Sequence, residues 1–202
     1  MTQPRLTITG HTRGIGYHVA NLFASKGWEI SGWSRTNDRG LPDALEKPQD
    51  VERMFDFLED ADKSEVTILN ANLGFFNPRL FLQLYNRYNG QTVTFNGQPV
   101  PKIIIVVGSN VTDITRNQTD IYQIQKGALE MAVRQVQQLQ GSSVHKPYVG
   151  LIKPGLVDTN AVRSILGKKM QPSTIANLIW HMVETKRLHD YCIYEMTVMP
   201  NE

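Results

Sequence analysis

At 202 residues the chain is long enough to form one globular domain with a substantial core that needs neither disulfides nor a structural metal. Its formal charge of +2 is too small to indicate a nucleic-acid protein or a membrane-surface protein. The chain contains no run of about 18 apolar residues, the length that a membrane-spanning helix needs. The single cysteine, Cys192, cannot form an intrachain disulfide, and a strand-like pattern begins within a few residues of Met1. We therefore expect a cytoplasmic protein without a signal peptide.

The first part of the chain predicts strands and helices in alternation. Residues 5–9 are rich in β-forming residues and end in a glycine turn, and the apolar residues that follow at helical spacing predict a helix ending at Gly27. The next expected elements are a strand at 28–33, a helix from 48 or 49 to about 59, a strand at 66–70, a helix at 78–88 and a small hairpin at 92–100 around Asn96-Gly97.

The second part of the chain continues this alternation. Residues 102–108 are nearly continuous β-branched and apolar sequence, typical of a central parallel strand covered by helices on both faces. Residues 121–140 predict the clearest helix, whose glutamines we expect to face solvent. Its apolar seam consists of Ile121, Ile124, Ala128, Ala132, Val136 and Leu139. The remaining expected elements are a strand at 148–152, a short helix near 161–166, a longer helix at 172–185 and a last strand near 191–197.

The order of these elements predicts the fold class. Strands and helices alternate along the whole chain, without a linker or a repeat. Parallel strands joined by right-handed helical crossovers form a doubly wound sheet with helices on both faces. We therefore expect a single domain over residues 1–202, with a Rossmann-type α/β fold in three α/β/α layers.

A glycine-rich turn lies between the first predicted strand and the first predicted helix. Gly10, Gly14 and Gly16 lack Cβ atoms, so the chain can turn sharply and its backbone can approach a pyrophosphate. Free N–H groups at the helix N-terminus would stabilise the negative charge. We interpret the turn as a dinucleotide-binding site; the alternative is that the glycines only allow close packing of strand and helix.

The residues after the second predicted strand bear on the choice of cofactor. An NAD site usually has an acidic residue there, which holds the ribose 2′-hydroxyl, but this chain has Ser34 and Arg35. These side chains could hold a 2′-phosphate, and Arg13 in the glycine turn could add a second cation. We therefore expect NADP(H) rather than NAD, unless Arg35 is only a solvated loop residue.

A candidate acid/base pair lies on the helix predicted at 121–140. Tyr122 and Lys126 are four residues apart and project from one side of it. A nearby ammonium and a positively charged oxidised nicotinamide would lower the phenol pKa from its usual value of about 10. Ser109 follows the central strand, at the edge where such sheets bind ligands, and could hydrogen-bond a substrate carbonyl or hydroxyl. This trio predicts proton transfer to or from a bound substrate.

In order and spacing, these residues resemble the short-chain dehydrogenase/reductase family over almost the whole chain. The matching segments are TGHTRGIG at 9–16, Asn70-Ala71, Ser109 thirteen residues before Tyr122, YQIQK at 122–126 and KPGLVDT at 153–159. The resemblance implies that Tyr122 is the catalytic acid/base, that Lys126 holds the nicotinamide ribose and lowers the tyrosine pKa, and that Ser109 orients the substrate. Besides Tyr122 and Lys126, the residues expected to bind the cofactor are Gly10, Arg13, Gly14, Ile15, Gly16, Ser34, Arg35, Asp43, Asn70, Ala71, Pro154, Gly155, Val157 and Thr159.

The sequence also departs from the family pattern. Family members are usually longer, and the region between Arg35 and Pro48 is too short for a full helix and strand, so we expect one crossover to be trimmed. The asparagine that commonly joins Ser, Tyr and Lys has no clear counterpart, and Asn86 is a weak candidate. The segment after Thr159 is brief, which indicates a small substrate lid and an open site.

Two functions remain as hypotheses. The first is an NADP(H)-dependent oxidoreductase that reduces a small-molecule carbonyl to an alcohol, or catalyses the reverse reaction. The second is a non-catalytic or weakly active NADP(H)-binding sensor or scaffold. The histidines show no metal-ligand spacing, so no metal site is expected. The resemblance also implies a homodimer or homotetramer, although the glutamine-rich outer face of the 121–140 helix does not predict a strong apolar interface.

Overall fold

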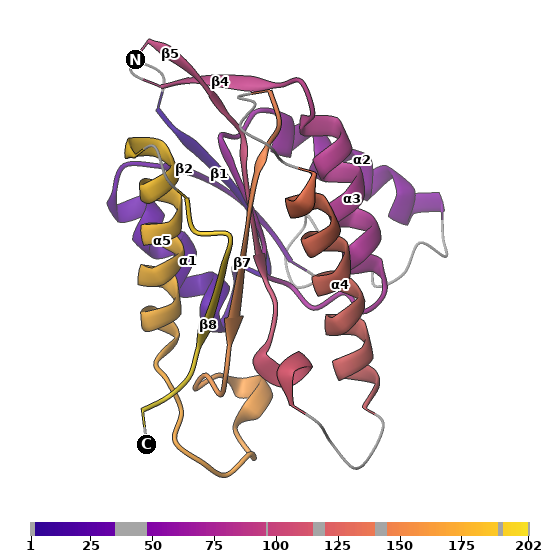
Figure 1. Ribbon diagram of the computed structural model, residues 1–202, viewed down its shortest axis with the longest axis vertical. Coiled ribbons are helices and arrows are strands. Elements are labelled where there is room, and N and C mark those ends of the chain that lie inside the picture. The colour runs from indigo at the N-terminus through magenta and orange to yellow at the C-terminus, as the bar shows by residue number, and fades with distance from the viewer. Residues whose placement is uncertain are drawn as a thin grey trace.

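Three layers make up the structure, a computed structural model that describes residues 3–34, 48–95, 97–114, 120–139, 145–189 and 192–201. A central β-sheet lies between two layers of helices (Figure 1). One layer contains α1 (Gly14–Ser25) and α5 (Pro172–Leu188), and the other contains α2 (Pro48–Asp62), α3 (Phe76–Tyr88) and α4 (Ile121–Gln138). The predicted α/β/α architecture is confirmed.

Within the described residues the central sheet has six strands, and all neighbouring strands in it are parallel. Their order across the sheet is β2 (Glu29–Trp33), β1 (Arg5–Thr9), β3 (Val66–Leu69), β6 (Ile103–Val107), β7 (Tyr148–Pro154) and β8 (Glu195–Val198). The predicted central strand is β6, and each of its residues is buried because helices cover both faces of the sheet. The chain winds outward from β1 on one side and from β3 on the other, and this reversal leaves a crevice at their carboxyl ends.

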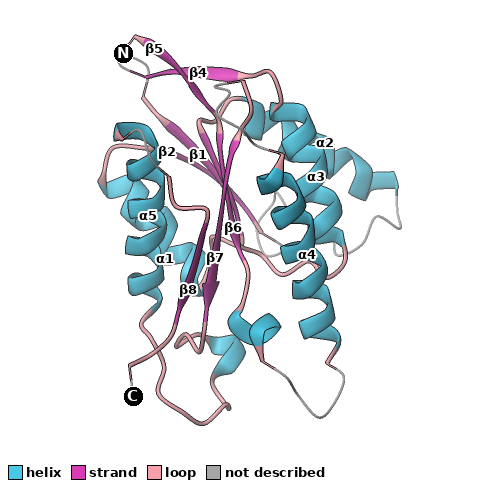
Figure 2. Cartoon of the chain, viewed as in Figure 1, coloured by secondary structure: helices cyan, strands magenta, loops and turns pink. Residues whose placement is uncertain are grey.

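Two small elements lie at opposite ends of this sheet. The predicted hairpin is present as β4 (Thr92–Phe95) and β5 (Gln98–Pro101), which lie away from the carboxyl ends of the parallel strands (Figure 2). At the carboxyl ends, the short helix predicted near 161–166 is wrong, because this segment contains only a 3-10 turn, η2 (Asn160–Val162). Leu166 is 94% exposed, so it lacks the packing that a short helix needs to be stable in water.

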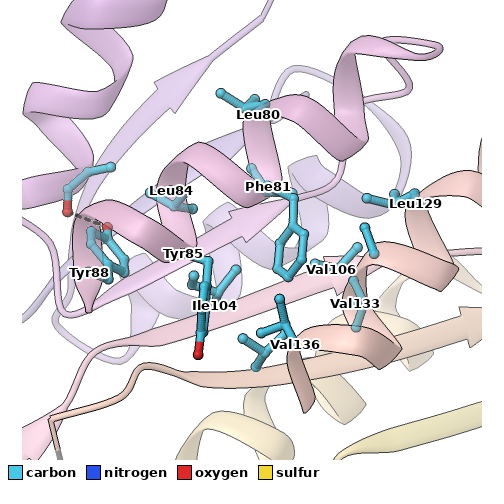
Figure 3. Close-up of a cluster of buried hydrophobic side chains, with 14 of the residues drawn as sticks. Leu80, Phe81, Leu84, Tyr85, Tyr88, Ile104, Val106, Leu129, Val133 and Val136 are labelled. Atoms are coloured by element: carbon cyan, nitrogen blue, oxygen red, sulfur yellow. Dashed lines mark hydrogen bonds between the residues drawn. The ribbon is translucent and has the colours of Figure 1, made fainter. Parts of the chain in front are cut away.

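The face that α4 buries is not the predicted seam. The residues of α4 that reach the core are Leu129, Ala132, Val133 and Val136. Figure 3 shows Val133 and Val136 beside Phe81 of α3, with Ile104 of β6 in the same cluster. Of the predicted seam, only Ala132 and Val136 belong to this buried face.

Polar residues explain why the predicted seam was wrong. Ile121, Ile124 and Leu139 are exposed, whereas the buried side of α4 includes Lys126 and Glu130. A prediction that places only apolar residues on the buried face of a helix leaves out buried lysine and glutamate residues. The predicted face therefore differs from the observed one by a rotation about the helix axis. Both polar residues face the region at the carboxyl ends of the strands, where they find charged or hydrogen-bonding partners.

At its outer edge the described sheet ends with β2, and the expected trimming of a crossover stays a prediction. Among the described residues, β2 pairs only with β1, and no strand lies beyond it. Residues 35–47, where we expected the shortened crossover, lie outside the described part of the chain. None of the described helices is long and apolar enough to cross a membrane.

Candidate active site

A cavity of about 560 Å³ opens at the carboxyl ends of β1, β3, β6 and β7. The predicted residues in its wall are Gly10, Arg13, Gly14, Ile15, Ser34, Asn70, Ala71, Ser109, Tyr122, Lys126, Pro154, Gly155, Val157 and Thr159. Gly16 is buried directly behind the glycine turn. Arg35 and Asp43 lie outside the described residues. Segments far apart in the sequence thus meet in one pocket, as the strand reversal requires.

The glycine turn has the backbone geometry of an anion site. Gly10 and Gly14 have φ angles of +71° and +56°, a region that residues with a Cβ rarely adopt. A Cβ added at Gly16 would lie 2.2 Å from the carbonyl oxygen of Gly10, so only glycine lets helix and turn approach this closely. The N-cap residue of α1, Arg13, makes no side-chain capping hydrogen bond, and the first turn contains no acidic residue. The N–H groups at this helix end are thus available to an anion in the cavity.

Asn70 braces the glycine turn from the end of β3. Its side-chain Nδ2 donates to the carbonyl oxygens of Thr9 and Gly10, at 3.2 Å each. The backbone N–H groups of Asn70 and Ala71 both donate to the Thr9 hydroxyl, at 2.9 and 3.0 Å. Asn70 therefore lines the cavity, as predicted, and also holds β1 and β3 together at their carboxyl ends.

His11 of the glycine turn packs against Gly32 in β2. A Cβ added at Gly32 would lie 2.5 Å from three atoms of the His11 ring, so a larger residue would displace the histidine. Nδ1 of His11 is buried without a hydrogen-bond partner among the described residues, so the ring is held mainly by packing. Close contact between β2 and the turn thus depends on a glycine that the sequence motif does not include.

We expect Gly32→Ala to destabilise the protein by about 1–3 kcal/mol, because overpacking forces His11 and the turn to shift. The melting temperature should fall by about 2–4 °C for each kcal/mol. His11→Ala removes the clashing ring, so the double variant should recover most of the loss in a thermal unfolding measurement. Equal melting temperatures for Gly32→Ala and the double variant would contradict this packing relation.

Ser109, Tyr122 and Lys126 lie together at the other end of the cavity. Ser109 follows β6 and precedes the 3-10 turn η1 (Asn110–Asp113), and it lines the cavity together with Tyr122, close enough for its hydroxyl to act on the pKa of the phenol. Lys126 is 4% exposed, and its Nζ donates to the carbonyl oxygen of Val107 at 3.0 Å. The Asp120 carboxylate caps α4 by accepting from the Tyr122 N–H, so the helix begins where the tyrosine enters the cavity.

Burial shifts the pKa values of Tyr122 and Lys126 in opposite directions. Burial raises the pKa of the Tyr122 phenol, and the hydrogen bond from Ser109 offsets this only in part. The lowering of this pKa that is expected from Lys126 together with an oxidised nicotinamide stays a prediction. Burial also lowers the pKa of Lys126 to about 8, and no carboxylate forms an ion pair with its ammonium among the described residues. Near neutral pH the Tyr122 phenol is therefore protonated, and the pKa of Lys126 lies only a little above the pH.

The asparagine expected from the family pattern is not Asn86, which is exposed and does not belong to the cavity wall. The buried asparagine of α3 is Asn77, whose Nδ2 donates to the carbonyl oxygen of Ala71 at 3.1 Å. Asn77 supports the cavity wall from behind. Asn77 lies in the first turn of α3, so no long loop separates this helix from Gly74. The short spacing between Gly74 and Asn77 is the sequence feature that could have indicated the contact of Asn77 with the cavity wall.

Several residues of the cavity wall were missed by the sequence analysis. They are Thr12, Asn72, Leu73, Val107, Gly108, Asn160, Ala161 and Val162. Most directly follow or precede predicted residues, so they could have been found by extending each motif by a few positions. Among the described residues, no group of His, Cys, Asp and Glu side chains could hold a metal ion. The described site contains a glycine turn with the geometry of an anion site, a phenol, a hydroxyl and a buried amine.

Comparison with solved structures identifies the fold. A short-chain dehydrogenase from Sphingobium yanoikuyae in complex with NADPH has a TM-score of 0.74 at 17% identity, over 98% of this chain and 87% of that one. An alcohol dehydrogenase from the archaeon Thermococcus sibiricus, complexed with 5-hydroxy-NADP, has a TM-score of 0.71 at 19% identity, over 98% and 96%. A 3-alpha-hydroxysteroid dehydrogenase from a Pseudomonas species, complexed with NADH, has a TM-score of 0.68 at 17% identity, over 96% and 95%.

Comparisons of the sequence, unlike those of the structure, find no match. No family model matches the sequence, and no curated protein matches it either. At the identities found among solved structures, the likeness establishes the fold alone. That fold is the one shared by the short-chain dehydrogenases, which confirms at this level the resemblance seen in the motifs.

Proposed function

We propose that this protein is an NADP(H)-dependent oxidoreductase that reduces a carbonyl to an alcohol, or catalyses the reverse. One observation supports this above all. A single cavity contains an anion-binding glycine turn at one end and Ser109, Tyr122 and Lys126 at the other. A dinucleotide fits this arrangement, because its pyrophosphate lies in the middle of the molecule and its nicotinamide riboside extends from there to one end.

The residues that would hold the cofactor fit its chemistry. A Cβ at Gly10 or Gly16 would press on Asn70 or on the turn itself, so the cradle keeps its shape only with glycine, and the backbone at Gly10 and Gly14 can approach a pyrophosphate in the cavity. Arg13 and Ser34 belong to the cavity wall and are suited to a 2′-phosphate. Complexes with NADPH or NADP among the similar structures support this preference, and the contact of Arg35 with the 2′-phosphate stays a prediction.

The chain's own groups suit proton transfer. The bound cofactor supplies the hydride. Because the phenol of Tyr122 is protonated near neutral pH, it is ready to give a proton to a substrate oxygen, with Ser109 donating a hydrogen bond to the same oxygen. Lys126 is charged below its pKa of about 8, and its positive charge stabilises the tyrosinate that the transfer leaves behind.

A second candidate function is a binding protein that senses NADP(H) without useful turnover. One observation favours it: α3 contributes no asparagine to the described cavity wall. The trio of Ser109, Tyr122 and Lys126 favours the enzyme, because a protein that only binds the dinucleotide has no evident need for these groups together.

The outer side of α4 supports the homodimer or homotetramer implied by the family resemblance. Ile121, Ile124 and Met131 are 59%, 46% and 61% exposed on this helix. This side is more apolar than its glutamines suggested. A second copy of the chain would remove these side chains from water.

Binding and turnover can be measured separately on the purified protein. We expect NADPH to bind at least about tenfold more tightly than NADH in a fluorescence titration, which corresponds to about 1.4 kcal/mol. We also expect NADPH oxidation with at least one member of a panel of aldehydes, ketones and quinones. Tight NADPH binding with no oxidation across the panel would favour the sensor, and equal affinity for NADH would exclude the NADP preference.

A further inference from the structure

A buried lysine lies beside the candidate active site and has no role in the steps above. Lys153 is the sixth residue of β7 and is 1% exposed. Its Nζ forms ion pairs with Asp113, with Glu130 at 3.1 Å and with Glu195 at 3.6 Å. These three carboxylates come from η1, α4 and β8. One ammonium therefore joins four separate elements around the carboxyl end of the sheet.

The partners are needed because an unpaired buried ammonium is costly. Burial lowers the pKa of Lys153, but hydrogen bonds to Asp113 and Glu130 outweigh it, and the net pKa is raised. The lysine thus stays charged and attracts all three carboxylates. Arg134 also pairs with Glu130 and Glu195 from the solvent side, but among the ion pairs of the described residues only Lys153 contacts Asp113. Removing one partner of such a cluster leaves the others uncompensated.

Thr112 connects this cluster to the backbone of Ser109. Its hydroxyl lies within hydrogen-bonding distance of the Glu130 carboxylate and 2.9 Å from the Ser109 carbonyl oxygen. Gln123 of α4 fastens the same turn, because its Nε2 donates to the carbonyl oxygens of Val111 and Ile114 at 2.9 and 2.8 Å. The 3-10 turn η1 is therefore tied both to the helix that carries Tyr122 and to the strand that carries Lys153.

We propose that Lys153 and Thr112 are positioning residues that hold Ser109 against Tyr122. The proposal rests on the proposed function and names two further residues on which its rate depends. Asp113 is the fourth residue after Ser109, so its ion pair with Lys153 holds the far end of η1, while Thr112 holds the carbonyl of Ser109 itself. Proton transfer and substrate orientation require the reacting groups to be placed within a fraction of an ångström.

Single-turnover hydride transfer tests this role. We expect Lys153→Met to lower the rate about 10- to 100-fold and Thr112→Val to lower it about tenfold, with the Kd for NADPH within about threefold of wild type. Thr112→Ser keeps the hydroxyl and should restore the rate. Arg134→Gln is the matched control, since it removes a cation from the same carboxylates without touching η1, and should stay within about twofold. Should Lys153→Met fail to fold, the two Thr112 variants test the proposal.

A second measurement separates this inference from the proposed function. Tyrosine labelled with ¹³C at Cζ, with Tyr122 assigned by its loss in Tyr122→Phe, reports the titration of the phenol without any turnover. Since the hydrogen bond from Ser109 lowers the Tyr122 pKa, displacement of Ser109 in Thr112→Val should raise it, and Thr112→Ser should not. An unchanged Tyr122 titration in Thr112→Val, or a rate loss in Arg134→Gln as large as in Lys153→Met, would overturn the proposal. If wild type shows no turnover, the titration alone decides.

Discussion

Tyr122→Phe is expected to lower kcat for NADPH-dependent carbonyl reduction by about 10²- to 10⁴-fold, the usual contribution of a general acid. The substitution removes one hydroxyl, and with it the proton that the substrate oxygen receives. The ring remains and still covers the same part of the cavity wall, so the Kd for NADPH should stay within about threefold. Steady-state kinetics and a fluorescence titration on the same preparation measure the two effects.

A matched control for this prediction is Tyr17→Phe. Tyr17 lies on α1, is 50% exposed and does not belong to the cavity wall. Its loss of a hydroxyl should leave both kcat and NADPH affinity unchanged. Unchanged turnover in Tyr122→Phe would refute the proposed mechanism, whereas a parallel loss of cofactor binding would show that the tyrosine acts mainly in the cradle.

Gly16→Ala is expected to weaken NADPH binding by at least about 100-fold, or about 2.7 kcal/mol. The added methyl group would lie 2.2 Å from the Gly10 carbonyl oxygen and 2.6 Å from Nδ2 of Asn70. One of these neighbours is backbone, so the turn itself must move away from the helix N-terminus. The same overpacking should destabilise the fold by about 1–3 kcal/mol, which thermal unfolding without cofactor measures.

Gly127→Ala is the matched control, since a Cβ there meets no atom within 4 Å. Gly127 lies inside α4, where alanine is a better helix former by about 0.5–1 kcal/mol, so this variant should be as stable as wild type or more so. Its NADPH affinity should not change. Wild-type affinity in Gly16→Ala would show that the turn does not hold the phosphates.

Much of the fold could be predicted from local sequence patterns, because these depend only on residues that are neighbours in the chain. The five residues of β6 are all apolar and buried, and the bounds predicted for it differ from those observed by one residue at each end. The spacing of Tyr122 and Lys126 is likewise a property of one helix. Where packing with distant segments decides, prediction failed: the seam through Ile121 and Ile124 is exposed, and the short helix near 161–166 is not formed.

The sequence by itself determined the alternation of elements, the glycine turn and the identity of the residues that could carry proton transfer, since each is written in short-range spacing. The tertiary structure alone decided that Ser109 lies with Tyr122 in one cavity wall and that Asn70 braces the glycine turn. It alone decided that Lys153 is buried among carboxylates from three other elements. These contacts join residues far apart in the chain. Their formation depends on how the sheet and helices pack, which no local pattern specifies.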